Sequence, residues 1–396
     1  MEQDYKEELT EFGEKAGVIA EDEGTVKDPF APEDIRISKK VISMDQVVRR
    51  LTANTLCLAP EFQRSEVWTQ TKKSQLIESL MLNIPIPLFY VAADNTGAWD
   101  VVDGLQRLSA IKEFLVDKTL VLSNLEFLGE KYNGKTIDDK DFSPIFFNRI
   151  YETEFSFIII EPGTPDSVKY NIFKRINTGG VFLSAQEIRH ALFQGKGTRL
   201  LSELAKNDVF LQATDWSIND TRMAAREVIL RCLSFMLLGE DGYLNNDNME
   251  SFLRKGIQVL NFLDNRDVLL EKKVFRDGKV PEIRISSYND LKRLFFTSMQ
   301  RNFELFGKDA FRISKSNMRR SPINKALFDS WGTILAFLPD KDYEKLKDDR
   351  DLLIEKYDSK KDDKVFYDAV SRTAWQKSKV DIRFKEIRQL IQDVIG

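Results

Sequence analysis

Histidine is almost absent from this sequence, whose 396 residues include His190 and no other histidine. An HNH nuclease needs a histidine base and generally a further histidine or similar ligand at its metal, so that class is close to excluded. Ser-His-Asp or Cys-His catalysis would have to run through His190 alone. Cysteine is nearly as scarce, because Cys57 and Cys232 are the only two and lie far apart. Neither a Cys/His zinc site nor a disulfide framework is therefore expected.

The chain also lacks long apolar runs, a signal-peptide pattern and an excess of basic residues. No apolar run approaches the length that crosses a bilayer, and the acidic, polar residues 1–6 are not typical of a secretory signal. Together with the scarce cysteines, this predicts a cytoplasmic protein without a membrane partner. The formal net charge is −4, whereas proteins that coat DNA are usually basic. Any contact with DNA is therefore expected at a local basic patch.

What the chain does have is length and apolar content sufficient for two domains. Hydrophobic residues make up 42% of it, and 28 of its residues are phenylalanine, which predicts aromatic-rich cores. We predict an acidic tail or arm over residues 1–36, an α+β domain with a small mixed sheet over 37–196, and an all-α helical domain over 197–396. The last boundary is placed near Gly195-Lys196-Gly197, where strand-like alternation gives way to long helical stripes.

The pattern of the α+β domain predicts short strands interleaved with helices. Strands over 88–91 and 99–102 should form a hairpin around the turn Asn95-Thr96-Gly97, and residues 155–160 have the strongest strand pattern. Ser184 and Glu187 have the spacing of a capping box. A further strand is predicted over 56–58, and helices are predicted from Ser43, over 71–82, after Gly104 and over 164–176. The long helical stripes of the second domain lie at 228–238, 252–263, 291–306, 326–337 and 382–395.

The first candidate site is the segment Asp103-Gly104-Leu105-Gln106-Arg107, where a predicted strand turns directly into a helix. The first amides of a helix are unpaired and carry partial positive charge, so they can bind an anion. Gly104 permits a sharp turn, and the Arg107 guanidinium suits phosphate oxygens. Asp103 could hold a divalent metal, and Gln106 could position water or a nucleotide. The alternative interpretation is a capped helix with Arg107 in a salt bridge.

Two further segments could contribute to the same site. Gln63 and Arg64 are predicted on a loop between a strand and a helix, where they can reach inward. Asn177 and Thr178 precede two glycines, and the segment could expose consecutive backbone donors to an anion. A helix C-cap explains the same glycines without a ligand. The segment is not a Walker loop, because the Gly-Lys-Ser/Thr ending is missing.

A basic stretch from Arg312 to Lys325 contains no acidic residue. In an acidic chain, its Lys315, Arg319 and Arg320 are the best candidates for a DNA contact. The alternative is a solvated basic face without a ligand. His190 is expected to be a structural or surface histidine, with a role facing a ligand as the alternative.

Taken together, these motifs resemble a known family. The resemblance is to the N-terminal module of GmrSD-type, modification-dependent restriction systems, which is often named for its "DGQQR" motif. It covers roughly residues 37–195, and looser similarity continues around 322–328. The segments that carry it are 60–64 with Val67-Trp68, 76–79, 84–87, 102–108, 173–180, Leu183-Ser184 and 186–189.

The resemblance implies a ParB/sulfiredoxin-like fold and a nucleotide-binding, in several members nucleotide-hydrolysing, domain used in defence against foreign DNA. It assigns the motif's role to Asp103, Gly104, Gln106 and Arg107, and extends it to Gln63 and Arg64. The chain departs from the pattern at Leu105, which replaces the first glutamine of the motif. The HNH nuclease domain of full restriction members is not seen either, so the resemblance is to a stand-alone member.

Two functions remain open from the sequence. The leading hypothesis is a Mg²⁺-dependent NTPase or nucleotide-gated switch, whose catalytic residues would be Asp103, Gln106 and Arg107, with Asp103 at the metal. Phosphoryl transfer needs mainly charge neutralisation and water positioning, which arginines and one carboxylate can supply. The alternative is a non-catalytic DNA-binding or sensor module that works with a separate nuclease. A nuclease in its own right would need a carboxylate cluster, of which the sequence offers only Asp103.

Overall fold

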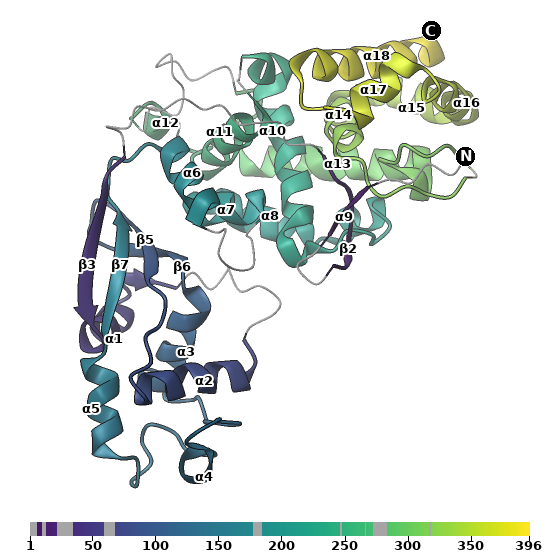
Figure 1. Cartoon of the computed structure of the whole chain (residues 1–396). Coiled ribbons are helices and arrows are strands. Elements are labelled where there is room, and N and C mark those ends of the chain that lie inside the picture. Colours follow the sequence, from purple (N-terminus) through teal and green to yellow (C-terminus); the bar gives the residue numbers. More distant parts are fainter. Residues whose placement is uncertain are drawn as a thin grey trace. The chain divides into compact units, whose positions relative to one another are not determined.

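The computed structural model divides the chain into two compact units (Figure 1). We call Pro29–Phe182 the sheet unit, and Met1–Asp28 together with Leu183–Gly396 the helical unit. The structure describes residues 6–9, 13–21, 35–58, 68–176, 184–245, 248–265, 267–271, 283–316 and 318–396.

The sheet unit contains a five-stranded mixed sheet in the order β3-β7-β5-β6-β4. The pairs β3–β7 and β5–β6 are antiparallel, whereas β5–β7 and β4–β6 are parallel. The strands are β3 (Ile37–Ser43), β4 (Leu56–Cys57), β5 (Phe89–Ala93), β6 (Trp99–Asp103) and β7 (Glu154–Ile160). The helices of this unit are α1 (Met44–Thr52), α2 (Gln70–Met81), α3 (Leu105–Leu115), α4 (Gly129–Tyr132), α5 (Pro144–Glu152) and α6 (Asp166–Ile176).

Aromatic packing at the centre of the sheet fixes the strand that leads to the candidate site. The Phe89 ring on β5 stacks on Phe157 of β7 with 5.0 Å between centroids, and Trp99 of β6 lies 5.4 Å from Phe157. All three side chains are buried. β6 is therefore anchored at its first residue by Trp99, and its last residue, Asp103, is exposed at the end of the strand.

The helical unit is built from long helices around one apolar core. Four of the five long stripes predicted for this part of the chain lie within observed helices, and the fifth, 252–263, runs two residues past the end of its helix at Asn261. The α-helices of this unit among the described residues are α7 (Ala185–Leu192), α8 (Lys196–Ala205), α9 (Asp208–Ala213), α10 (Ala224–Leu244), α11 (Met249–Asn261), α12 (Asp267–Glu271), α13 (Tyr288–Phe306), α14 (Lys325–Phe337), α15 (Asp340–Asp348), α16 (Arg350–Lys360), α17 (Lys364–Ser371) and α18 (Lys377–Ile395). The predicted fold class, a small mixed sheet followed by an all-helical region, is confirmed.

The division into units differs from the predicted one at both ends of the sheet unit. The second boundary lies between residues 182 and 183 rather than near 196, and residues 1–28 group with the helical unit instead of forming a separate arm. Strands β1 (Glu7–Leu9) and β2 (Lys15–Ile19) pair antiparallel. Ile19 donates its backbone N–H to the Ile323 carbonyl at 2.8 Å, and Ile323 donates to the Gly17 carbonyl at 2.9 Å. These contacts involve residues about 300 positions away, which a local sequence pattern does not show.

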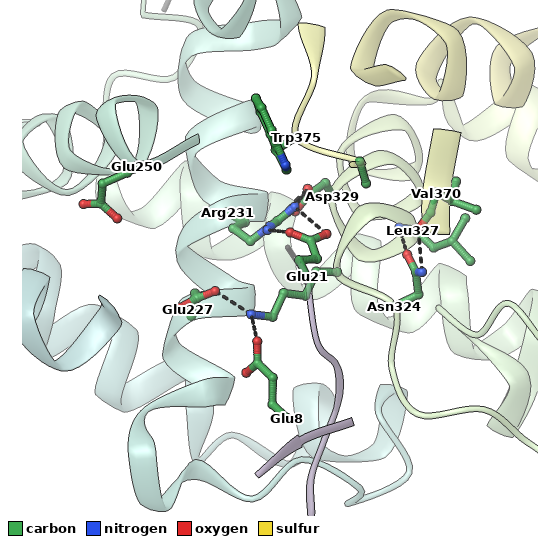
Figure 2. Close-up of polar contacts among 12 residues, drawn as sticks. Glu8, Glu21, Glu227, Arg231, Glu250, Asn324, Leu327, Asp329, Val370 and Trp375 are labelled. Atoms are coloured by element: carbon green, nitrogen blue, oxygen red, sulfur yellow. Dashed lines mark hydrogen bonds and ion pairs between the residues drawn. The ribbon is translucent and has the colours of Figure 1, made fainter. Parts of the chain in front are cut away.

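A buried charged cluster joins the N-terminal segment to the helices (Figure 2). The Arg231 guanidinium on α10 lies 2.7 Å from Asp329 of α14 and 2.6 Å from Glu21. Burial alone would raise the pKa of Glu21, but the charge and hydrogen bond of Arg231, together with the charges of Lys325 and Arg383, hold that pKa below its usual value. A buried guanidinium needs such partners, because an unpaired ion in the interior costs several kcal/mol.

Lys325 at the start of α14 repeats this arrangement with Glu8 and Glu227, which Figure 2 labels. Its ammonium lies 2.6 Å from both Glu227 of α10 and Glu8 of the N-terminal hairpin, and only 4% of its side chain is exposed. Burial would lower the pKa of Lys325, but the two carboxylates outweigh it and raise that pKa. Burial likewise opposes ionisation of Glu227, but Lys325 and Arg189 hold the Glu227 pKa at about 2. The glutamates of the predicted acidic tail thus neutralise buried cations.

Candidate functional site

The first candidate site is the connection between β6 and α3. β6 ends at Asp103 and α3 begins at Leu105, with Gly104 as the N-cap residue. Gly104 has no side chain that could accept hydrogen bonds from the first turn of α3. The amides of that turn are therefore left for solvent or for an anion.

Gly104 is required here for two separate reasons. Its φ of 96° lies in the left-handed region, which glycine adopts without a steric penalty. A Cβ atom at this position would lie 2.3 Å from Cδ1 of the buried Phe89 ring and 3.1 Å from an Nη atom of Arg107. Both contacts are too close, so the backbone of the turn can only approach the sheet this closely with glycine.

Arg107 connects this turn to the two residues that precede β5. Its Nη2 lies 2.8 Å from Oδ2 of Asp103, and its Nη1 donates to the carbonyl of Pro87. Both Nη atoms lie 3.4 Å from the carbonyl oxygen of Leu88. The guanidinium also lies over the Phe89 ring, 4.6 Å from its centroid. The structure therefore contains the Arg107 salt bridge of the alternative interpretation. The same guanidinium holds the backbone of the two residues just before β5 in place.

The two charged groups of this pair differ in exposure. Only 12% of the Arg107 side chain is exposed, against 49% for Asp103. Burial lowers the pKa of Arg107, while the Asp103 carboxylate opposes that shift. In the described part of the chain the Nε–H of Arg107 donates to no partner, so this N–H can donate a hydrogen bond to a ligand. A ligand in solvent can reach the carboxylate of Asp103 directly.

Gln106 links the turn to Trp68, which lies just before α2. Its side-chain oxygen accepts a hydrogen bond of 3.2 Å from the backbone N–H of Trp68. Trp68 is the first described residue after the segment that holds Gln63 and Arg64, and those two residues lie outside the described part of the chain. Asn177 and Thr178 also lie outside it. The structure thus brings together Asp103, Gln106 and Arg107 of the predicted nucleotide site.

The described residues of this site do not form a dedicated metal cage. Among the described residues, no group of three or more histidine, cysteine, aspartate or glutamate side chains could hold a metal ion. Asp103 is a single exposed carboxylate. One such ligand fits Mg²⁺ that is held mainly by nucleotide phosphates and water, which is how Mg²⁺ usually binds. It does not fit a cation that needs a protein cage of its own.

Several residues of the matching motifs have a structural role. The carboxylate of Glu78, 3% exposed, accepts hydrogen bonds of 2.7–2.9 Å from the backbone N–H groups of Glu126, Phe127 and Leu128. The predicted capping box is present, because Glu187 donates its N–H to Ser184 and receives a hydrogen bond in return. 

Arg189, from the same motif as that capping box, is buried in the helical unit. Its guanidinium contacts Gln186 at 2.9 Å and Glu227 at 3.0 Å, and also pairs with Glu250. His190, the next residue on α7, is fully buried. A side chain in this position cannot face a ligand at the surface.

The predicted DNA-contact residues Lys315, Arg319 and Arg320 line a cleft of about 1210 Å³ in the helical unit, which we call the basic cleft. Lys315 lies 2.5 Å from Asp362, and Arg320 lies 2.5 Å from Asp215. Arg312, the first residue of the predicted basic stretch, also lines it, and the sequence did not indicate the three remaining cations, Lys15, Lys361 and Lys364. No local pattern could have indicated Lys15 and Lys364, because the fold alone brings them to this surface.

Comparison with protein families gives one match. Residues 46–194 match the family model described as "GmrSD restriction endonuclease, N-terminal domain". Comparison with curated proteins and with solved structures gave no match. In the described part of the chain, no helix is long and apolar enough to span a bilayer. The matched segment runs from α1 through α7 and contains the whole turn from Asp103 to Arg107. Over residues 46–194 the chain thus carries a domain of the GmrSD restriction endonuclease N-terminal family, as its motifs predicted.

Proposed function

We propose that the chain binds a nucleoside triphosphate at the turn Asp103–Arg107 and acts in defence against foreign or modified DNA. The observation that carries this proposal is the ion pair of Asp103 and Arg107 beside the uncapped first turn of α3. A helix start and a partly engaged guanidinium together suit a phosphate group. The match to a restriction-family domain over residues 46–194 supports the defence setting.

Each residue of the turn has a separate role in this proposal. The first-turn amides of α3 and the free N–H of Arg107 would bind phosphate oxygens. The amide nitrogen of Gln106 would donate to the nucleotide or to a water, because its oxygen is already held by Trp68. Asp103 would hold a Mg²⁺ ion, which neutralises phosphate charge and can activate water when it is bound.

Nucleotide binding by the purified chain tests this proposal directly. Each of the four ribonucleoside triphosphates would be titrated with Mg²⁺ by calorimetry, and turnover measured as released phosphate. Arg107→Ala should weaken binding at least about tenfold, because a hydrogen bond to a charged group contributes about 1.5–3 kcal/mol. Hydrolysis that is lost in this variant would make the chain an NTPase, and tight binding without turnover would make it a nucleotide-gated switch.

A matched control separates loss of the site from loss of the fold. Arg49→Ala removes an arginine that also pairs with an aspartate four residues earlier, Asp45, at 2.8 Å on an exposed helix face. This variant should bind nucleotide as the wild type does. The melting temperatures of both variants would be compared, because Arg107 also holds the carbonyls of Pro87 and Leu88. Unchanged affinity in Arg107→Ala would refute the proposed site.

The basic cleft favours a second candidate function, which is nucleic-acid binding without turnover, in cooperation with a separate nuclease. The predicted Lys315, Arg319 and Arg320 all line it. Phosphate contacts release counterions, so such binding should weaken steeply as salt is added.

A further inference from the structure

Three segments that are far apart in the sequence form the walls of the basic cleft. Strand β2 contributes Lys15 and Gly17, and the segment between α13 and α14 contributes residues from Arg312 to Pro322. The third wall is the start of α17, with Lys361 just before it and Lys364 at its first position. The N-terminal hairpin is thus one side of the cleft as well as a part of the core.

Positive charge dominates the cleft. Among the described residues, its lining holds seven cations and two carboxylates, Glu7 and Asp362. Asp215 and Asp358, which pair with cleft cations from outside the lining, do not reverse this excess. A concave surface with walls of low dielectric focuses such a field and concentrates anions within it. The seven cations are Lys15, Arg312, Lys315, Arg319, Arg320, Lys361 and Lys364.

Two of these cations are built into the cleft wall itself. Arg312 is 5% exposed and donates to the carbonyls of Lys308 and Ser321, and Lys361 is 6% exposed and donates to the carbonyl of Ser314. Burial lowers the pKa of Arg312, and the neighbouring Arg320 adds to this shift. Burial also lowers the pKa of Lys361. An anion in the cleft would relieve this accumulation of positive charge.

The cleft also offers apolar and aromatic surface beside its cations. Tyr367 and Met318 line it, and 65% of the Met318 side chain is exposed. At about 1210 Å³ it exceeds the range of about 300–1,000 Å³ that is typical of small-ligand clefts. Positive grooves with aromatic platforms are typical of proteins that bind single strands, whose bases are free to stack. A duplex, by contrast, keeps its bases paired and stacked, so they are not free to stack on protein side chains.

We propose that the basic cleft binds single-stranded nucleic acid, with its phosphates along the cations and its bases against Tyr367 and Met318. This inference rests on the second candidate function and specifies its ligand as a single strand and its site as a three-walled cleft. Lys15 and Lys364 are contact residues in this arrangement. Both are exposed, and Lys15 pairs with Glu7 at 3.4 Å.

Fluorescence anisotropy of the full chain with an oligodeoxythymidine of about 12 nucleotides tests the inference. The double variant Lys15→Gln/Lys364→Gln should bind the strand at least about tenfold more weakly. The slope of log affinity against log salt between about 50 and 200 mM should become shallower by about 1.4, since each phosphate contact to a single strand contributes about 0.7. An equivalent RNA strand and an equal-length duplex form the other arms.

The matched control removes two exposed lysines that also form surface ion pairs but lie outside the cleft. Lys196 pairs with Asp264 at 2.8 Å, and Lys347 pairs with Glu304 at 3.0 Å. The variant Lys196→Gln/Lys347→Gln should bind the strand as the wild type does. Equal affinity of the two double variants would overturn the assignment to the cleft.

The remaining outcomes separate this inference from the two proposed functions. Duplex binding as tight as strand binding would overturn the single-strand assignment and leave DNA binding intact. Strand binding that Arg107→Ala abolishes would place the strand at the turn of α3 and overturn the cleft. If neither strand nor duplex binds, the inference and the second candidate function both fall. The nucleotide titration with Arg107→Ala decides the first function independently.

Discussion

His190 shows how burial sets the chemistry of a single residue. Its side chain is fully buried on α7, and burial together with the nearby Arg226 guanidinium lowers its pKa to about 4. In the unfolded chain the same imidazole titrates near pH 6.5. Between these two values the unfolded state binds more protons than the folded state. Folding stability therefore rises with pH across this window and is lost as the pH falls through it.

The stability contributed by neutral His190 should thus be present above pH 6.5 and lost by pH 4. The shift corresponds to about 3 kcal/mol. We expect His190→Gln to unfold more easily at pH 7 but to lose less stability than the wild type between pH 6.5 and 4.5. Urea unfolding at a series of pH values measures this difference in slope. Identical slopes in the two proteins would show that His190 is not the group responsible.

At the scale of single residues, the sequence predicted the local backbone structure of the candidate site but not its longer-range contacts. The strand–turn–helix at Asp103–Arg107 could be predicted because its residues are consecutive and the spacing of four places aspartate and arginine on one side of the helix start. The contacts of Arg107 with the carbonyls of Pro87 and Leu88 could not be predicted. They depend on how β5 and β6 pair, which is a tertiary property.

Among the elements, α2 depends on one buried carboxylate. Glu78 accepts three backbone hydrogen bonds from residues 126–128 and thereby fixes that loop against the helix. Glu78→Gln leaves a single oxygen and brings an amide donor against backbone donors. We expect it to lower the free energy of unfolding by about 2–4 kcal/mol, measured by urea unfolding.

The control for this variant lies one turn earlier on the same helix. Gln75 donates to Glu126 at 3.2 Å on the exposed side, so Gln75→Ala should change the stability by only about 0.5 kcal/mol. If Glu78→Gln unfolds at the same urea concentration as Gln75→Ala, the buried carboxylate does not hold the loop.

Strands with a buried residue or face, such as β7 and the edge strand β4, were predictable, and the exposed edge strand β3 was not. β7 is recognisable because Phe155, Phe157 and Ile159 alternate toward the core. β3 forms the edge of the sheet, and its Lys39 and Lys40 are partly or fully exposed. Charged residues are typical of edge strands, where they discourage pairing with other chains, but they also remove the apolar alternation that identifies a strand.

At the scale of the whole molecule, the helical unit combines residues that precede the sheet unit in the sequence with residues that follow it, and its stability depends on both. Removal of residues 1–21 would take away Glu8 and Glu21, leaving Lys325 and Arg231 with one carboxylate partner fewer each. Breaking a buried pair in this way costs about 3–5 kcal/mol. We expect the truncated chain to show a lower melting temperature for the helical unit and an unchanged transition for the sheet unit in calorimetry.

Lys15→Ala is the control for this truncation, because 71% of its side chain is exposed and its ion pair lies at the surface. It should melt as the wild type does. A truncated chain that melts at the wild-type temperature would show that the N-terminal glutamates do not stabilise the helices. The sequence could not predict this dependence, since the carboxylates and their cations are about 200–300 residues apart.

The same arrangement imposes an order on how the protein forms during its synthesis. Glu8 and Glu21 leave the ribosome long before Arg231 and Lys325 exist. At about 5–20 residues per second, the wait is about 10–60 s. The sheet unit, whose residues are consecutive, is complete during that time and can fold first. Until then, the Glu8 and Glu21 carboxylates keep the N-terminal segment hydrated. The acidity of the first residues therefore keeps the nascent chain soluble and later stabilises the folded protein.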